Sequence, residues 1–347
     1  MPPNPRRPMS GLRRKRLLFS YAPDWIITIM LAAAFFALDK VHGYRRVFSL
    51  EDTSLRHPFA EKERVPDVAL IMICFIAPLV IQPLINVLTI RSWWDLHNGT
   101  LGLILGLALT GAVTQLTKIT VGRPRPDIIA RCHPPQNATD PIFGLSTDAI
   151  CTNTDVAIMR DGFRSFPSGH SSLSFAGLGF LSFYLAGKLH LFDKRGHAGK
   201  AWLSLTPFAG AVLVAISRTM DYRHHWHDVL VGSALGTFFA YFSYRQYYPS
   251  LSSELSHRPY SPRIKEDLDA VLPFHGRNDS VPVMNQDSIS GPATNSAHRR
   301  QESATQQPLT AHVEQEENYE LEGTAPRPGG PGHLYNVWSE GRKDEEV

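Results

Sequence analysis

Residues 95–117 read DLHNGTLGLILGLALTGAVTQLT, and this stretch decides the fold class. No lysine, arginine, aspartate or glutamate lies between Asp95 and Lys118. Because a helix needs about 20 apolar residues to cross a bilayer, the stretch predicts a membrane-spanning helix. Five more apolar segments occur, at 22–41, 66–90, 170–188, 201–217 and 226–245. The expected fold is therefore all-α, a six-transmembrane helical bundle within residues 22–248.

Prolines and glycines inside these segments predict local geometry. Pro78 and Pro83 lie in the second segment and predict a kinked helix. Glycines at small-xxx-small spacing predict close helix–helix approach in lipid. The two pairs are Gly102 with Gly106 and Gly232 with Gly236.

Positive charges orient the bundle. Basic residues cluster before the first segment, at 13–16, and around the loop between the fourth and fifth segments. The positive-inside rule places both clusters in the cytosol. The N-terminus (1–21) and the C-terminal tail (249–347) then share that side. Three loops, at 42–65, 118–169 and 218–225, face the lumen or the cell exterior.

The loop 118–169 contains two features that fit a non-cytosolic location. Asn137-Ala-Thr is a possible glycosylation site. Cys132 and Cys151 lie in the same polar loop and would form a disulfide in an oxidising compartment, although sequence alone does not fix the distance between them. The expected location is a vacuolar, Golgi, endoplasmic reticulum or plasma membrane.

Composition bounds the remaining functions. The net charge is only +3, which leaves no large nucleic-acid footprint. The tail is rich in Ser, Pro, Gln, Glu, Asn and Gly and lacks apolar periodicity, so we expect it to be disordered. Its role in regulation stays open.

Two short stretches on the non-cytosolic side carry groups suited to binding an anion. Lys118 and Arg125 are separated by six residues and supply a compact charge and a planar fork for phosphate oxygens. Ser168, Gly169 and His170 precede the fourth segment. A helix N-terminus binds phosphate through free N–H groups, and histidine exchanges a proton near neutral pH.

A third stretch lies between the last two segments and contains Ser217-Arg218, His224 and Asp228. The last two are four residues apart, so on a helix they share a face. Asp228 would then accept a hydrogen bond from His224 and leave its other nitrogen free to attack. Ionisable residues are costly at a membrane unless they have a function or a partner, and these three stretches converge at one face.

Together the residues resemble the three-part signature of the type-2 phosphatidic acid phosphatases, also called lipid phosphate phosphatases. That signature is Lys-x6-Arg-Pro, Pro-Ser-Gly-His and Ser-Arg-x5-His-x3-Asp. It is matched by Lys118, Arg125, Pro126, Pro167, Ser168, Gly169, His170, Ser217, Arg218, His224 and Asp228. Residues 48–52, 57–59 and 94–98 are similar to the fungal diacylglycerol pyrophosphate phosphatase branch.

The resemblance implies hydrolysis of phosphomonoesters or diphosphates of membrane lipids in two steps. His224 would attack phosphorus to form a phosphohistidine, and His170 would protonate the leaving oxygen. The substrate phosphate would be held by Lys118, Arg125, Ser168, Gly169 and Arg218. Fixed cations would replace a metal ion, so the resemblance implies no metal and no cofactor.

Several alternatives stay open. His224, His225 and His227 beside Asp228 form a metal-ligand set by residue type, although the surrounding cations favour an anion. Sphingoid-base phosphates, prenyl diphosphates and glucose 6-phosphate are other substrates for such a site. A vanadium haloperoxidase, a non-catalytic scaffold and a transporter fit less well, because of the six spans, the complete histidine set and the location at one face.

Overall fold

The computed structural model describes residues 11–193, 196–263 and 324–327. The chain divides into two units, and every helix among the described residues belongs to the unit formed by residues 1–262 and 323–347. Its long helices are α1 (Gly11–Lys40), α4 (Trp93–Val121), α7 (Gly169–Lys188), α8 (Ala198–Met220) and α9 (Trp226–Tyr247). A sixth runs without a break through α2 (Asp67–Ile71), the π-helical η2 (Met72–Ile76) and α3 (Ala77–Leu88). The short helices are η1 (Thr53–Leu55), α5 (Ile128–Cys132), η3 (Asp148–Ile150) and α6 (Val156–Gly162).

The described residues contain helices and two isolated bridges but no strand, which confirms the all-α prediction. Each of the six predicted segments is a helix. Four of them are long and apolar enough to cross a membrane: Leu17–Lys40, Asp67–Leu88, Trp93–Val121 and Ala198–Met220. The other two are α7, which is mostly buried and carries many small and polar residues because it faces other helices, and α9, which exposes Leu230, Phe238 and Phe242. In α7 the buried serines are Ser171, Ser172, Ser174 and Ser182.

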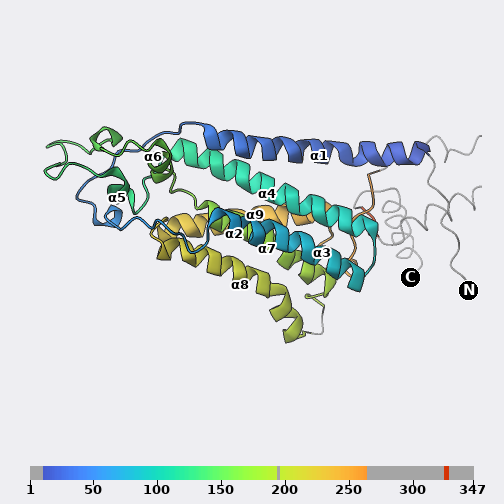
Figure 1. Cartoon of the computed structure of the whole chain (residues 1–347). Helices are drawn as coiled ribbons and strands as arrows, with labels where there is room; N and C mark the ends of the chain where they lie inside the picture. The colour runs from blue at the N-terminus through green and yellow to red at the C-terminus, as the bar shows by residue number, and fades with distance from the viewer. Residues whose placement is uncertain (1–10, 194–195, 264–323, 328–347) are drawn as a thin grey trace, which may run out of the picture. The chain divides into compact units, whose positions relative to one another are not determined.

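Helix α7 lies inside the bundle, packed against α4, α8 and α9 (Figure 1). Gly232 and Gly236 allow α9 to approach it closely. A Cβ at Gly236 would lie 2.2 Å from the carbonyl oxygen of Ser172, and one at Gly232 would lie 2.6 Å from that of Ser168. On another side, Gly177 of α7 contacts the backbone of Cys74 within the π-helical turn. Pro78 and Pro83 predicted a kink in this helix, and the π-helical turn is the irregularity found there.

A buried polar cluster fixes the opposite end of α7. Lys188 Nζ donates to Asp95 Oδ1 at 2.5 Å and to the carbonyl of His257 at 2.6 Å. The hydroxyls of Tyr184 and Tyr248 also donate to the Asp95 carboxylate. The bundle thus holds the chain that follows α9.

Ordered structure extends beyond the predicted helical domain at both ends. Helix α1 begins at Gly11, so residue 22 lies inside a helix rather than at its start. Residues 250–263, predicted as disordered tail, are described: Ser256 and Tyr260 are buried, and Tyr260 N donates to the carbonyl of Tyr247. The remainder of the predicted tail, 264–323 and 328–347, lies outside the described residues, as do residues 1–10.

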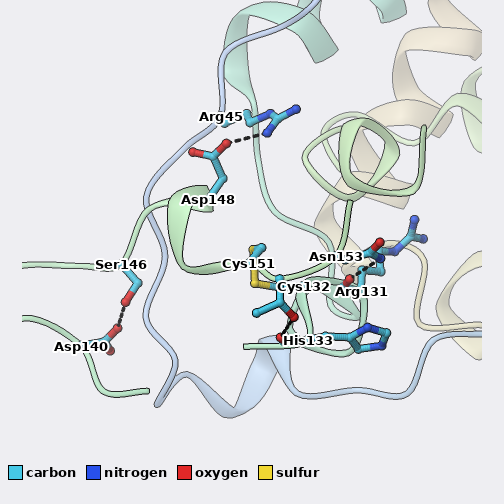
Figure 2. Close-up of a disulfide and its surroundings, with 10 residues drawn as sticks. Arg45, Arg131, Cys132, His133, Asp140, Ser146, Asp148, Cys151 and Asn153 are labelled. Atoms are coloured by element: carbon cyan, nitrogen blue, oxygen red, sulfur yellow. Dashed lines mark hydrogen bonds and ion pairs between the residues drawn. A yellow bond between two sulfur atoms is a disulfide. The ribbon is translucent and has the colours of Figure 1, made fainter. Parts of the chain in front are cut away.

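The segments 41–66 and 122–168 form a cap at one end of the bundle (Figure 1). Cys132 and Cys151 are joined by a disulfide, with Cα atoms 4.5 Å apart (Figure 2). Asp140 binds both cap segments, because it accepts hydrogen bonds from Ser49 Oγ at 2.5 Å and from Ser146 Oγ at 2.6 Å. The cap is therefore cross-linked where it surrounds the predicted site.

Candidate active site

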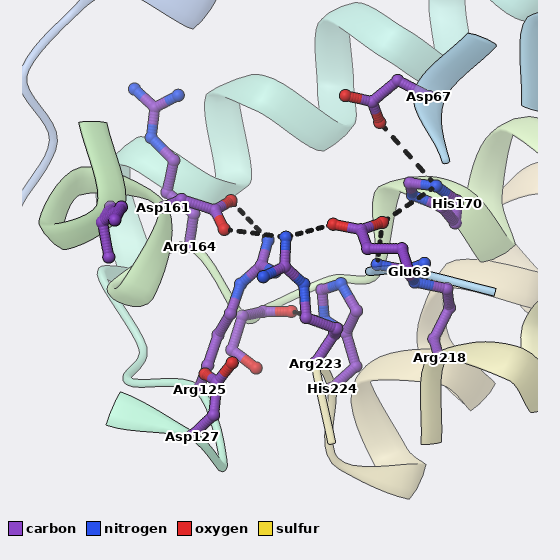
Figure 3. A network of polar contacts seen from close by, with 12 residues as sticks. Glu63, Asp67, Arg125, Asp127, Asp161, Arg164, His170, Arg218, Arg223 and His224 are labelled. Atoms are coloured by element: carbon purple, nitrogen blue, oxygen red, sulfur yellow. Dashed lines mark hydrogen bonds and ion pairs between the residues drawn. The ribbon is translucent and has the colours of Figure 1, made fainter. Parts of the chain in front are cut away.

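Four helix ends meet under the cap. Helix α4 ends at Val121, α7 begins at Gly169, α8 ends at Met220 and α9 begins at Trp226. Because these helices alternate in direction, the three predicted stretches come together here. Figure 3 shows Arg125, His170, Arg218 and His224 in one group.

Three arginines and two carboxylates form the charged wall of this site. Arg125 Nη2 donates to Asp161 Oδ1 at 2.7 Å, and Arg218 Nη2 lies 2.9 Å from Glu63 Oε2. Arg223 lies between the two acids: its Nη2 bonds Glu63 Oε1 and is 3.3 Å from Asp161 Oδ2 (Figure 3). Burial alone would raise the pKa of Asp161, but the charges of Arg125, Arg131 and Arg223 hold it below its usual range.

Several buried N–H groups of these arginines have no acceptor. They are Nε and Nη1 of Arg125, Nε of Arg218 and Nε of Arg223, judged over the described residues. Burial lowers the pKa of Arg125 to about 10, and at neutral pH it remains charged. A buried donor without a partner costs free energy, so a ligand with several acceptor oxygens fits here.

The first turn of α7 adds further donors. Ser168 is the N-cap, and its Oγ accepts from Ser171 N. Across the described part of the chain, the N–H groups of Gly169 and His170 have no hydrogen-bond acceptor, as is usual for a first turn. Lys118 approaches the same turn, since a Cβ added to Gly169 would lie 3.0 Å from Lys118 Nζ. The predicted anion-binding residues are therefore neighbours.

His224 is buried and oriented by a backbone carbonyl. Its Nδ1 lies 2.7 Å from the oxygen of Ser165. A carbonyl only accepts, so Nδ1 carries the proton and Nε2 keeps its lone pair. Burial, then the charges of Arg125, Lys118 and Arg218, hold the pKa of His224 well below its usual range. The ring is thus neutral and nucleophilic near pH 7.

Asp228 does not hold His224 directly, and that predicted contact is wrong. Helix α9 begins at Trp226 with His225 as its N-cap, so His224 lies before the helix and the four-residue spacing does not place both on one face. Asp228 Oδ2 instead accepts from Ser165 Oγ at 2.6 Å and from His225 N at 3.1 Å. Ser165 therefore connects the two residues, with its hydroxyl on Asp228 and its carbonyl on His224.

His170 faces the segment that leads into α2. Its Nε2 lies 3.0 Å from the carbonyl oxygen of Val65, 3.7 Å from Asp67 Oδ1 and 3.9 Å from Glu63 Oε2. Because Nε2 donates to a carbonyl, Nδ1 is the nitrogen left for proton transfer while this segment stays in place.

Comparison with known proteins agrees with this geometry. The profile of the PAP2 superfamily matches residues 99–251. The probable diacylglycerol pyrophosphate phosphatase 1 of Schizosaccharomyces pombe is 38% identical over 245 residues, 68% of this chain and 84% of the relative. The probable lipid phosphate phosphatase 4 of Arabidopsis thaliana is 34% identical over 285 residues, 81% of this chain and 91% of the relative.

The chain belongs to the PAP2 superfamily. A third relative, diacylglycerol pyrophosphate phosphatase 1 of Saccharomyces cerevisiae, is 37% identical over 66% of this chain and 78% of its own length. The resemblance is thus confirmed, and the relatives include two fungal diacylglycerol pyrophosphate phosphatases. No solved structure matches this chain significantly.

Five residues at this PAP2 site were not among the predicted site residues. They are Glu63, Arg123, Asp161, Ser165 and Arg223. Arg123, which follows Lys118 in the first motif, pairs with Asp228 Oδ1 at 2.9 Å. Arg223 and Ser165 adjoin predicted motifs, so their nearness to these motifs in the sequence could have indicated a place in the site. Glu63 and Asp161 lie in cap segments far away in the sequence, and only the folded cap brings them here.

The described residues offer one possible metal-ligand group, which differs from the predicted set. It contains His225, His227 and Asp228, with donor atoms within 4.8 Å of one another, and does not include His224. Arg123 already pairs with Asp228, and its charge opposes a cation at that carboxylate. The residue chemistry around His224 fits an oxyanion better than a metal.

Proposed function

We propose that the protein is an integral-membrane lipid phosphate phosphatase. It hydrolyses phosphomonoesters or diphosphates of lipids, with diacylglycerol pyrophosphate, phosphatidate and lysophosphatidate as substrates. The observation that carries this proposal is the group of buried arginine N–H donors without acceptors beside a neutral, oriented His224. Membership of the PAP2 superfamily and the names of the yeast relatives support the choice of lipid.

In the proposed reaction, Nε2 of His224 attacks phosphorus, so a P–N bond forms as the P–O bond to the leaving group breaks. With the phosphoryl dianion bound, His170 acts in its protonated form: it gives its Nδ1 proton to the leaving oxygen, and Nδ1 then takes a proton from the water that cleaves the P–N bond. Orthophosphate and neutral His224 are regenerated. Asp228 acts through Ser165 and fixes the position of the His224 ring. The proton on Nδ1 of His224 is held by the carbonyl of Ser165.

The cations stabilise the charge on the phosphoryl oxygens in the transition state. Lys118, Arg125 and Arg218 supply positive charge, while Ser168 and the backbone N–H of Gly169 supply hydrogen bonds. With this charge built into the protein, we propose that hydrolysis needs neither a metal ion nor a cofactor.

We further propose that all six long helices span the membrane, with the active site on the lumenal or extracellular side. The disulfide Cys132–Cys151 fits an oxidising compartment, and Asn137 in the same cap is exposed. The basic residues at 13–16, which lie in α1 just before its apolar span Leu17–Lys40, support a cytosolic N-terminus. Lys188 is weaker support for a cytosolic location of the loop after α7 than its charge suggested, because its side chain is buried against Asp95.

A substrate panel tests this function. Purified protein in detergent, with excess chelator, is given diacylglycerol pyrophosphate, phosphatidate, lysophosphatidate and a sphingoid-base phosphate, and phosphate release is measured. We expect release from the first three, undiminished by the chelator. Absence of release from every lipid would refute the proposal, and activity that requires added metal would refute metal independence.

A further inference from the structure

Glu63 places a carboxylate inside the cationic site. Its Oε2 lies 2.9 Å from Arg218 Nη2, its Oε1 accepts from Arg223 Nη2, and His170 Nε2 is 3.9 Å away (Figure 3). The side chain of Glu63 is 19% exposed, and those of Arg218 and Arg223 are 1% and 11% exposed. The contact is therefore mostly shielded from water, which strengthens it.

A carboxylate and a phosphoryl group present the same chemistry to arginine. Each offers two oxygens that match the guanidinium fork. Glu63 occupies Arg218, which the proposed reaction assigns to the substrate phosphate, and it also lies beside the proposed acid. A phosphoryl dianion would be repelled by Glu63 at this distance. Both anions cannot bind these arginines together.

The chain around Glu63 is arranged so that it could withdraw. Its neighbours Lys62 and Arg64 line an open cleft of about 420 Å³ at the end of α8, together with Phe59, Asp221 and Tyr222. Arg64 is tied to Asp221 through both its backbone N–H and its guanidinium. Glu63 alone among these three points to the arginines, so a local shift of this one side chain releases Arg218 and leaves Arg223 with Asp161.

Arg223 has the features of a residue that binds phosphate. It directly precedes His224, and its Nη2 reaches Glu63 and Asp161, whereas its buried Nε has no acceptor among the described residues. Phe59 lies under its guanidinium, 5.6 Å from ring centroid to Cζ, and limits its rotation. Phe59 and Asp161 still contact Arg223 when Glu63 leaves.

We propose that Arg223 is a further phosphate-binding residue and that Glu63 holds Arg218 and Arg223 in the empty site until the substrate phosphoryl group displaces it. This inference rests on the proposed function of the same site. It makes the carboxylate of Glu63 a competitor of the substrate, and of any oxyanion that resembles it.

Inhibition by orthovanadate, an analogue of phosphate, tests this competition. The inhibition constant is measured for the wild type, Glu63→Gln, Arg223→Gln and the double variant, with Glu61→Gln as control, because Glu61 is an exposed glutamate of the same segment. We expect Glu63→Gln to lower the constant about tenfold and Arg223→Gln to raise it about tenfold, since each changes one charged hydrogen bond. The two effects are expected to be non-additive, because Glu63 acts partly through Arg223.

If Glu63 had only a structural role, Glu63→Gln would not lower the inhibition constant for vanadate. The proposal is overturned if Glu63→Gln leaves the inhibition constant equal to that of Glu61→Gln or raises it, or if Arg223→Gln leaves it unchanged. Should Glu63→Gln not fold, Glu63→Asp is the second variant: its shorter carboxylate cannot reach both arginines, so the constant should again fall.

The same experiment separates this inference from the proposed function. A wild type that hydrolyses no lipid phosphate refutes the proposed function. An active, vanadate-sensitive wild type with an unchanged Glu63→Gln refutes only the role of Glu63. The vanadate-induced rise in Tm provides a readout that does not depend on turnover, and it should be larger for Glu63→Gln than for Glu61→Gln.

Discussion

Ser165 connects the proposed nucleophile His224 to the buried carboxylate of Asp228 through two different atoms. Its carbonyl accepts from His224 Nδ1, and its hydroxyl donates to Asp228 Oδ2. Side-chain substitution can remove only the second of these bonds. Asp228 then keeps Arg123 and His225 as partners, so the site should remain assembled while the support of His224 loosens.

We therefore expect Ser165→Ala to lower kcat about tenfold with little change in KM, because one hydrogen bond to a charged group is lost. Steady-state kinetics on phosphatidate measure kcat and KM separately. The control is Ser174→Ala, which removes another buried hydroxyl, one that bonds only the carbonyl of Ser171. An unchanged kcat for Ser165→Ala would show that Asp228 does not act through Ser165.

The positive charges around His224 set the pH range of the reaction. Because burial and these charges depress its pKa, the neutral ring persists below the usual value of 6.5 and is lost only when the pH falls to the depressed pKa. Arg125→Gln removes one charge, raises the pKa of His224 and should move the acid limb of kcat/KM to higher pH.

Profiles of kcat/KM for the two proteins on the same substrate check this shift, since the ionisation of the substrate is common to both. Lys62→Gln, at an exposed lysine in the cap, serves as the control. Acid limbs at the same pH in all three proteins would contradict the proposed electrostatic effect.

At the scale of elements, the seam between α7 and α9 positions the site. Gly236 brings α9 against the backbone of α7, and α9 carries Asp228 at its start. The Cβ in Gly236→Ala would lie 2.2 Å from the carbonyl oxygen of Ser172, so the two helices must separate. We expect the variant to be destabilised by about 1–3 kcal/mol.

A lower Tm in detergent, together with a lower kcat, would confirm this effect of packing. Gly210→Ala in α8 is the matched control, because its added Cβ would be 3.4 Å from Leu178 Cδ1, close to ordinary contact. Equal Tm values for the two variants would show that the seam tolerates the extra methyl group.

At the scale of the whole molecule, the proposed orientation predicts which asparagine is glycosylated. Asn98-Gly-Thr and Asn278-Asp-Ser are the other two sequons. Asn137 is exposed in the cap, whereas Asn98 is buried in α4 and Asn278 lies in the predicted cytosolic tail. In a eukaryotic host we expect an endoglycosidase-sensitive band shift that Asn137→Gln abolishes. A shift that persists in Asn137→Gln and disappears in Asn278→Gln would reverse the topology.

The sequence predicted the six helices because apolar length is a local property, and it predicted the cationic site because three dense motifs carry it. It did not reveal that α7 is enclosed by other helices, which explains its buried serines. Nor did it place Glu63 and Asp161, since their positions depend on the folding of the cap. The error at Asp228 came from assuming a helix that already includes His224, two residues before α9 begins at Trp226.

The central claim is that His224 cleaves lipid phosphates without a metal ion. Phosphate release from diacylglycerol pyrophosphate, in excess chelator, by purified wild type and by an equally folded His224→Ala tests it most directly. We predict steady release by the wild type and a loss of at least about a thousandfold in the variant, because the nucleophile is removed. A His224→Ala variant with activity near that of the wild type would contradict the claim.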